Sequence, residues 1–278
     1  MTASCSHIVA NLDGNKLQVW RIADDGTSAS ELVALADSDA ASLAAALRNA
    51  IGGSAVPVLL AGSTLVPPVA VPGKPSDLRP KEIELDGLTV HALPGLCQNA
   101  PAGVILGATA RIEGFLRLNP NWDGVICLPG PVNHWVHVSA REVVSFQGAL
   151  TWPLVQSLAD TMRLDSTGPF DRSALTQSAA DSLAKPETLA ARLASVQAEA
   201  VVGQTSKEVL LGQLLGTLIG AELAAARPYW LGQNLALIAE PLLQSPYAAV
   251  LEAQALPVTL ADPDRMCLEG LKRAWEDR

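Results

Sequence analysis

Short runs of apolar and β-branched residues dominate the first sixty positions. Ser6–Ala10 and Lys16–Ile22 lie on either side of residues 13–15, an Asp-Gly-Asn turn composition, and predict a hairpin. Glu31–Ala34 is a candidate third strand. Val56–Ala61 is apolar throughout, which indicates a strand buried in a parallel sheet. The pattern therefore predicts a sheet that begins with a hairpin.

Apolar positions at helical spacing predict the helices. Asp37–Asn49 is rich in alanine and leucine and is followed by Gly52-Gly53, a stop signal, and Ala108–Leu118 ends at Asn119-Pro120. From Thr151 onward helices predominate. The predicted helices of this part are Trp152–Arg163, Ser173–Lys185, Pro186–Val202, Ser206–Ala226, Pro241–Ala255 and Asp262–Asp277.

The middle of the chain repeats the strand pattern. Residues 64–80 hold five prolines, which predict a long irregular loop, and Glu82–Leu93 reads as a second hairpin across Asp86-Gly87. The segment from Gly124 to Val136 then opens another strand-turn-strand unit. Its predicted strands, and those that follow later, are Val125–Leu128, Trp135–Val138, Glu142–Leu150, Asn234–Ala239 and Pro257–Leu260.

The order of these elements predicts two lobes, each opening with a β-meander and continuing in α/β units. We place them at residues 1–122 and 123–278, the second with a helical insert. This is the outline of an α/β protein with the two-lobed actin-like, ribonuclease H-like phosphotransferase fold. A length of 278 residues with 49% hydrophobic residues is sufficient for two cores.

Charge and cysteine content narrow the function classes. A net charge of −9 argues against nucleic acid or an anionic membrane as a partner. The apolar stretch Leu210–Ala226 is interrupted by glycines and polar residues, which favours a buried helix over a membrane span. No secretory signal is visible, and four widely spaced cysteines favour neither a zinc site nor a disulfide scaffold, so we expect a cytoplasmic protein.

Several motifs resemble the 2-dehydro-3-deoxygalactonokinase family over nearly the whole chain. They are Trp20, CLPG at 127–130 followed by Trp135, Phe146 before Thr151, LIGAEL at 218–223, LALIAEPLL at 235–243, Tyr247 and EGLKRAW at 269–275. The resemblance implies ATP and magnesium as cofactors and a 2-keto-3-deoxy sugar acid as the small-molecule substrate. A homo-oligomer is an open option.

The first hairpin departs from the family at its magnesium position. The family has an Asp-Trp-Gly-Thr type loop, and Asn11 replaces its carboxylate with an amide. Asp13 lies two residues on and is the candidate substitute, as metal ligand and catalytic residue, with Gly14 as a nucleotide contact. The alternative is that Asp13-Gly14 only forms a turn.

Other family positions give the remaining candidates. For the nucleotide these are Gly130, Asn133, His134 and Gly220. His134 stands where the family has a cation, and Pro131 cannot donate a backbone hydrogen bond. The alternative for Gly220 is close helix packing. Thr151 keeps a catalytic hydroxyl, although Pro153 replaces the nearby carboxylate. Arg111, Glu113 and Ser63 are the candidates for the sugar acid, because a guanidinium fork matches a carboxylate.

Two functions from different classes therefore compete. The first is an ATP-dependent sugar-acid kinase with some ligands shifted. The second is a relative that binds a sugar acid, a nucleotide or a protein without phosphoryl transfer, as the replacements at these positions suggest. A dehydrogenase is disfavoured because no GxGxxG follows a strand, and a metal-dependent hydrolase because the four histidines lack carboxylates at ligand spacing.

Overall fold

The protein forms two compact units in a computed structural model that describes residues 5–37, 39–52 and 56–278. The first unit comprises Met1–Asp123, Val138–Ser145 and Pro263–Arg278, and the second comprises Gly124–His137 and Phe146–Asp262. The C-terminal segment thus groups with the first unit. The lobe boundary between residues 122 and 123 stays a prediction.

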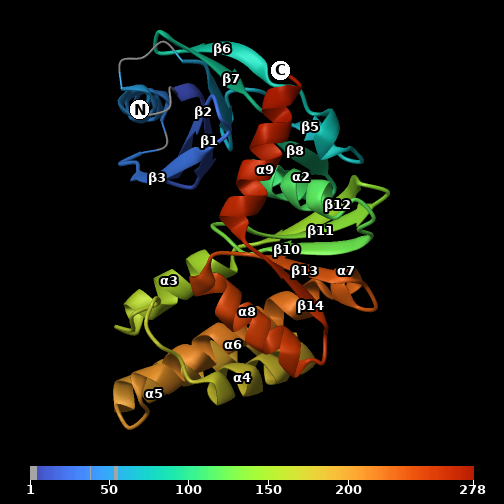
Figure 1. Cartoon of the computed structure of the whole chain (residues 1–278). Coiled ribbons are helices and arrows are strands. Elements are labelled where there is room, and N and C mark those ends of the chain that lie inside the picture. Colours follow the sequence, from blue (N-terminus) through green and yellow to red (C-terminus); the bar gives the residue numbers. More distant parts are fainter. Residues whose placement is uncertain (1–4, 38, 53–55) are drawn as a thin grey trace. The chain divides into compact units, whose positions relative to one another are not determined.

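A six-stranded mixed sheet forms the centre of the first unit, in the order β3-β2-β1-β4-β7-β6 (Figure 1). Both predicted hairpins are confirmed, since β1 pairs with β2 and β6 with β7 in antiparallel fashion. The buried parallel strand is confirmed as β4, which pairs in parallel with β1, where Asn11 lies opposite Ala61, and with β7. The strands are β1 (Cys5–Asp13), β2 (Lys16–Ala23), β3 (Ser28–Ala34), β4 (Val58–Ala61), β6 (Lys81–Leu85) and β7 (Leu88–Ala92).

A three-stranded sheet in the same unit was not predicted from the sequence. It has the order β5-β8-β9, with β5 (Val69–Ala70), β8 (Leu96–Asn99) and β9 (Ala102–Ile105). The proline-rich segment 64–80 holds β5 and a 3-10 turn, η1 (Pro75–Asp77), so it is less irregular than predicted. These strands have two to four residues each, too few for a periodic pattern to indicate them.

Three helices belong to the first unit: α1 (Ala40–Ile51), α2 (Ala108–Leu118) and α9 (Pro263–Glu276). Helix α1 begins after Asp39, whose side chain accepts a hydrogen bond from the Ser42 amide, and ends at Gly52 with φ 63°. Residues 38 and 53 of the predicted helix and stop lie outside the described residues. Helices α2 (green) and α9 (red) run side by side in Figure 1.

The second unit is built on a five-stranded sheet in the order β12-β11-β10-β13-β14. Val138–Ser145, which contains the end of β11, the following turn and the start of β12, groups with the first unit. Strand β10 pairs in parallel with β13, and β13 with β14. The strands are β10 (Gly124–Leu128), β11 (Asn133–Ser139), β12 (Glu142–Ala149), β13 (Leu235–Ile238) and β14 (Val258–Ala261).

Helices make up most of the rest of this unit. Helices α4 and α6 lie against each other (Figure 1). The buried leucines of α6 belong to the apolar core of this unit. The short η2 and α7 were not predicted as separate elements. The helical segments are α3 (Thr151–Thr161), α4 (Arg172–Ala184), η2 (Pro186–Thr188), α5 (Leu189–Val202), α6 (Lys207–Ala225), α7 (Arg227–Trp230) and α8 (Pro241–Ala253).

Helix α6 is the one helix of the described residues that is long and apolar enough to cross a membrane. However, 67% of its most apolar 18-residue window is buried inside the protein. Its leucines form part of the core of the second unit. The expectation of a buried helix in this stretch is therefore confirmed.

Candidate functional site

The carboxyl ends of two parallel strands bring several predicted residues together in the first unit. Strand β1 ends at Asp13, and Gly62 and Ser63 follow directly after its parallel neighbour β4. Gly62 has φ 86°, and a Cβ on it would lie 1.9 Å from the carbonyl oxygen of Leu12. A Cβ on Gly107 would lie 2.7 Å from Oδ1 of Asn11. Three backbone segments therefore meet here at distances that only glycine allows.

Two buried polar atoms at this edge have no hydrogen-bond partner among the residues that the structure describes. They are Oδ1 of Asn11, in a residue that is 2% exposed, and Oγ of Ser63, in a residue that is 4% exposed. Buried polar atoms are rarely left unpaired, and such exceptions often occur at functional positions. The edge is therefore the candidate site of the first unit.

The predicted metal ligand Asp13 and the predicted substrate residue Arg111 are partners in the structure. Nη1 of Arg111 donates to Oδ2 of Asp13 at 2.9 Å. Arg111 comes from the second turn of α2, which starts directly after Gly107. The structure therefore joins two residues that are 98 positions apart in the sequence.

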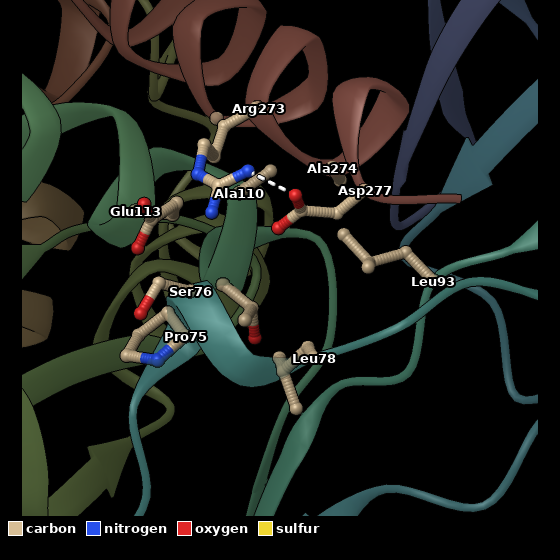
Figure 2. Close-up of a pocket in the computed structure, with 11 residues that line it drawn as sticks. Pro75, Ser76, Leu78, Leu93, Ala110, Glu113, Arg273, Ala274 and Asp277 are labelled. Carbon is tan, nitrogen blue, oxygen red and sulfur yellow. Dashed lines mark ion pairs between the residues drawn. The ribbon is translucent and has the colours of Figure 1, made fainter.

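Glu113 faces a different environment from Arg111, because side chains two positions apart on an α-helix point about 200° away from each other around the helix axis. It is 5% exposed and lines a cavity of about 10 Å³ together with Ser76, Arg273 and Asp277 (Figure 2). Figure 2 shows Arg273 pairing with Asp277 on the same wall. The volume suits one water molecule.

The charge of Glu113 is disfavoured by its surroundings. Burial raises the pKa of its carboxyl group, whereas the guanidinium groups of Arg141, Arg273 and Arg117 act in the opposite direction. The closest of these contacts joins Nη2 of Arg141 and Oε1 of Glu113 at 3.8 Å. The structure thus does not bring Glu113 together with Arg111, and its role in substrate binding stays a prediction.

In the second unit, a buried carboxylate collects four side-chain donors. Glu222 of α6 accepts from Nε1 of Trp135 at 2.7 Å, from Nδ2 of Asn133 at 2.8 Å and from the hydroxyl of Tyr247 at 2.6 Å. The hydroxyl of Thr151, a predicted catalytic group, also donates to it. Such charge-assisted bonds satisfy a carboxylate without a counter-ion.

The same network holds the turn that carries the nucleotide candidates Gly130, Asn133 and His134. The backbone amide of Gly130 donates to Oδ1 of Asn133 at 3.0 Å, and Nδ2 of Asn133 also contacts Tyr247. His134 is 7% exposed, and its ring meets Phe146 edge-on, with centroids 6.1 Å apart. The groups expected to contact a nucleotide here are therefore engaged inside the unit.

Gly220 and Gly14 have ordinary structural reasons to be glycine. A Cβ on Gly220 would lie 2.3 Å from the carbonyl oxygen of Ala179, so α6 and α4 could not pack as closely. Gly14 has φ 59° in the turn between β1 and β2. These positions support the helix-packing and turn alternatives, and the nucleotide contacts stay predictions.

Sequence reasoning did not identify Glu222, Trp135 and Tyr247 as one cluster. All three appear in the motifs of the family resemblance, but they come from three different elements, β11, α6 and α8. Burial and the neighbouring Glu222 carboxylate raise the pKa of Tyr247 and also that of the Cys127 thiol. A glutamate inside an apolar helix was the one available signal, since such a residue needs buried donors.

Side chains that could together hold a metal ion are not clustered in the described part of the chain. No group of three or more His, Cys, Asp or Glu side chains that could hold a metal occurs in residues 5–37, 39–52 and 56–278. Asp13, the carboxylate that the sequence suggested as a metal ligand, is paired with Arg111.

Comparisons with known proteins agree on the relationship. The chain is similar to the 2-dehydro-3-deoxygalactonokinase of Escherichia coli, with 25% identity over 229 residues, or 78% of this chain and 77% of the relative. A Rhizobium meliloti relative assigned to the same enzyme is 26% identical over 194 residues, covering 66% of this chain and 63% of the relative.

Solved structures show the same fold. A Sinorhizobium meliloti protein assigned to this kinase has a TM-score of 0.84 at 22% identity, covering 96% of this chain and 97% of its own. The activator of 2-hydroxyisocaproyl-CoA dehydratase from Clostridium difficile, solved with ADPNP, has a TM-score of 0.58 at 10% identity, covering 98% and 95%. The predicted actin-like sugar kinase fold is confirmed. Because residues 14–274 match the family of 2-keto-3-deoxy-galactonokinase, the chain belongs to that family.

Proposed function

We propose that the protein transfers the γ-phosphoryl group of ATP to a 2-keto-3-deoxy sugar acid of the 2-dehydro-3-deoxygalactonate type. The observation that carries this proposal is the family match over residues 14–274, which includes both units. The curated relatives carry this enzyme name. They give no support to the alternative of a relative that binds without phosphoryl transfer.

The first unit offers a group that suits the acid end of such a substrate. Arg111 pairs with Asp13 at the carboxyl edge of the sheet, the edge to which the buried oxygens of Asn11 and Ser63 also belong. A guanidinium recognises a carboxylate through parallel N–H donors, and hydroxyl and amide groups suit the hydroxyls of a sugar. We infer that Arg111 meets the substrate carboxylate and that Ser63 contacts the sugar.

Phosphoryl transfer depends mainly on the positioning of the reactants and on charge stabilisation. Magnesium, when bound with ATP, would neutralise charge on the transferred group. In the protein, Gly14, Gly130, Asn133, His134 and Gly220 remain the proposed nucleotide positions. The Thr151 hydroxyl donates to Glu222, so a direct catalytic part for it would require this bond to break.

The test is an assay that couples ADP release to 2-keto-3-deoxygalactonate at saturating magnesium-ATP. Turnover of this acid, with little turnover of a neutral sugar of the same size, is the expected result. Arg111→Ala should lower kcat/KM for the acid by about 30-fold or more, since it removes one partner of a charged pair. If ADP release is no faster with the protein than without it for every 2-keto-3-deoxy acid tried, the proposal is contradicted.

A further inference from the structure

Arg111, which pairs with Asp13, is more buried than the arginines of the other ion pairs of the described residues. The side chain of Arg111 is 12% exposed, whereas the arginines of the remaining pairs are between 29% and 62% exposed. Asp13 is 32% exposed, so one side of the pair is open to solvent. Partial burial reduces screening and makes the geometry of a charged pair more persistent.

Both ends of this pair are anchored by rigid elements. Asp13 is the last residue of β1 and pairs with Lys16 across the hairpin. On the other side, α2 is locked to α9 by two close approaches. A Cβ on Gly114 would lie 1.8 Å from the carbonyl oxygen of Met266, and one on Gly270 would lie 1.9 Å from that of Ala110. The backbone beneath Arg111 therefore has little freedom to shift.

A long arginine side chain on a fixed backbone still has several rotatable bonds, and ordering it costs conformational entropy. The carboxylate of Asp13 supplies that ordering before any ligand arrives, through the bond of 2.9 Å to Nη1. A guanidinium carries five N–H donors, so an orienting bond to one carboxylate is compatible with recognition of a second. Pre-organisation of this kind raises affinity.

We propose that Asp13 is a positioning residue, whose carboxylate orients the Arg111 guanidinium to receive the carboxylate of the sugar acid. This assignment rests on the proposed function, and it replaces the metal-ligand role that the sequence suggested for Asp13. It also accounts for a carboxylate next to the site of a negatively charged substrate, because the guanidinium lies between the two. Loss of Asp13 should therefore weaken acid binding and leave the use of magnesium unchanged.

The experiment measures binding of 2-keto-3-deoxygalactonate by calorimetry, without ATP or magnesium, so that the result does not depend on turnover. Asp13→Asn keeps the shape of the side chain and removes its charge. Its affinity should fall about tenfold, the size expected for one charge-assisted hydrogen bond, and Asp13→Glu should restore part of the loss. Asp13→Ser is a second charge-removing variant in case Asp13→Asn does not fold.

The matched control is Glu31→Gln, which breaks an exposed ion pair of the same length, Arg21–Glu31, in the same sheet. It should bind the acid as the wild type does. Wild-type affinity in both Asp13→Asn and Asp13→Ser would overturn the assignment, as would a wild type that binds no sugar acid. If Asp13→Asn binds the acid as the wild type does but needs more magnesium for turnover, the assignment is overturned and Asp13 is a metal ligand instead. A wild type that binds the acid without phosphorylating it would refute the proposed kinase reaction alone.

Discussion

At the scale of single residues, Glu222 determines the local structure of the second unit. Its two carboxylate oxygens accept hydrogen bonds from Asn133, Trp135, Thr151 and Tyr247, which come from the three elements β11, α3 and α8. A glutamate that is 5% exposed would be costly without these donors. The network thus fixes the 129–133 turn and the start of α3 relative to α6.

Glu222→Gln should destabilise the protein, because the new amide nitrogen faces donors and cannot accept their hydrogen bonds. We expect a loss of about 3 kcal/mol in the free energy of unfolding, because buried donors lose their charged acceptor and are left without a hydrogen bond. Urea denaturation followed by tryptophan fluorescence measures it, since Trp135 is one of the donors.

The control for this change is Glu252→Gln in the same unit. Glu252 pairs with Arg172, and both side chains are mainly exposed, at 76% and 62%. Removing an exposed pair should cost less than about 1 kcal/mol. Equal losses in the two variants would show that the Glu222 network contributes nothing special to stability.

The family resemblance and the residue types together supplied part of the candidate site. Arg111 was selected as a carboxylate-binding group, and its partner Asp13 was selected for another role, because no pattern within the sequence links positions 98 apart. Thr151 was selected for its hydroxyl, whose acceptor lies 71 positions away in α6. Residue types indicate what chemistry a side chain can perform, whereas the fold decides which partner it meets.

At the scale of elements, the glycines of α6 determine how closely two helices pack. A Cβ on Gly216 would lie 2.1 Å from the carbonyl oxygen of Leu175 in α4, and one on Gly212 would lie 2.5 Å from that of Asp171. Together with Gly220, these residues recur at every fourth position and form one face of α6. That face explains why three residues with poor helix propensity occur in a long helix.

Gly216→Ala should therefore push α4 and α6 apart, although alanine favours helix formation. We expect a net loss of about 1–3 kcal/mol, the usual cost of overpacking a core. Thermal and urea unfolding measure the change. Gly148→Ala is the comparison and should be nearly neutral, because its Cβ would come no closer to a neighbour than 3.4 Å, the distance to the Val132 side chain. A stabilised Gly216→Ala variant would contradict this account of the helix contact.

Elements with a strong period were predictable, and short ones were not. Helix α2 occupies the predicted range Ala108–Leu118, because its apolar positions recur at helical spacing over eleven residues. Strands β5, β8 and β9 depend instead on contacts with one another, and cis prolines at 72 and 101 lie next to two of them. Tertiary pairing, which a single sequence does not display, determines such elements.

At the scale of the whole molecule, the order of elements was enough to predict the fold class, because two similar strand-turn-strand blocks lead into α/β segments. The destination of the last helix was not predictable in this way. Helix α9 follows β14 in the sequence but packs with α2 and β1 in the first unit. The first strand and the last helix of the chain therefore stabilise the same unit.

A histidine at this junction makes the stability of the protein depend on pH. The ring of His7 in β1 stacks on Trp275 of α9, with centroids 4.0 Å apart and planes 3° apart, and the guanidinium carbon of Arg278 lies 3.3 Å from the same indole centroid. Burial, with a smaller contribution from the charge of Arg278, lowers the pKa of His7 from 6.5 to about 4. The unfolded chain therefore binds a proton more readily than the folded protein does.

The contribution of His7 to stability should thus be complete above pH 6.5 and should decline as the pH falls towards about 4. Chemical denaturation between pH 4 and pH 7 measures the slope in the wild type, in His7→Gln and in His7→Phe. Both variants should show a weaker decline than the wild type, since neither side chain titrates. His7→Phe separates titration from packing, because it keeps an aromatic ring against Trp275. If the decline is as steep in His7→Phe as in the wild type, protonation of His7 is not its cause.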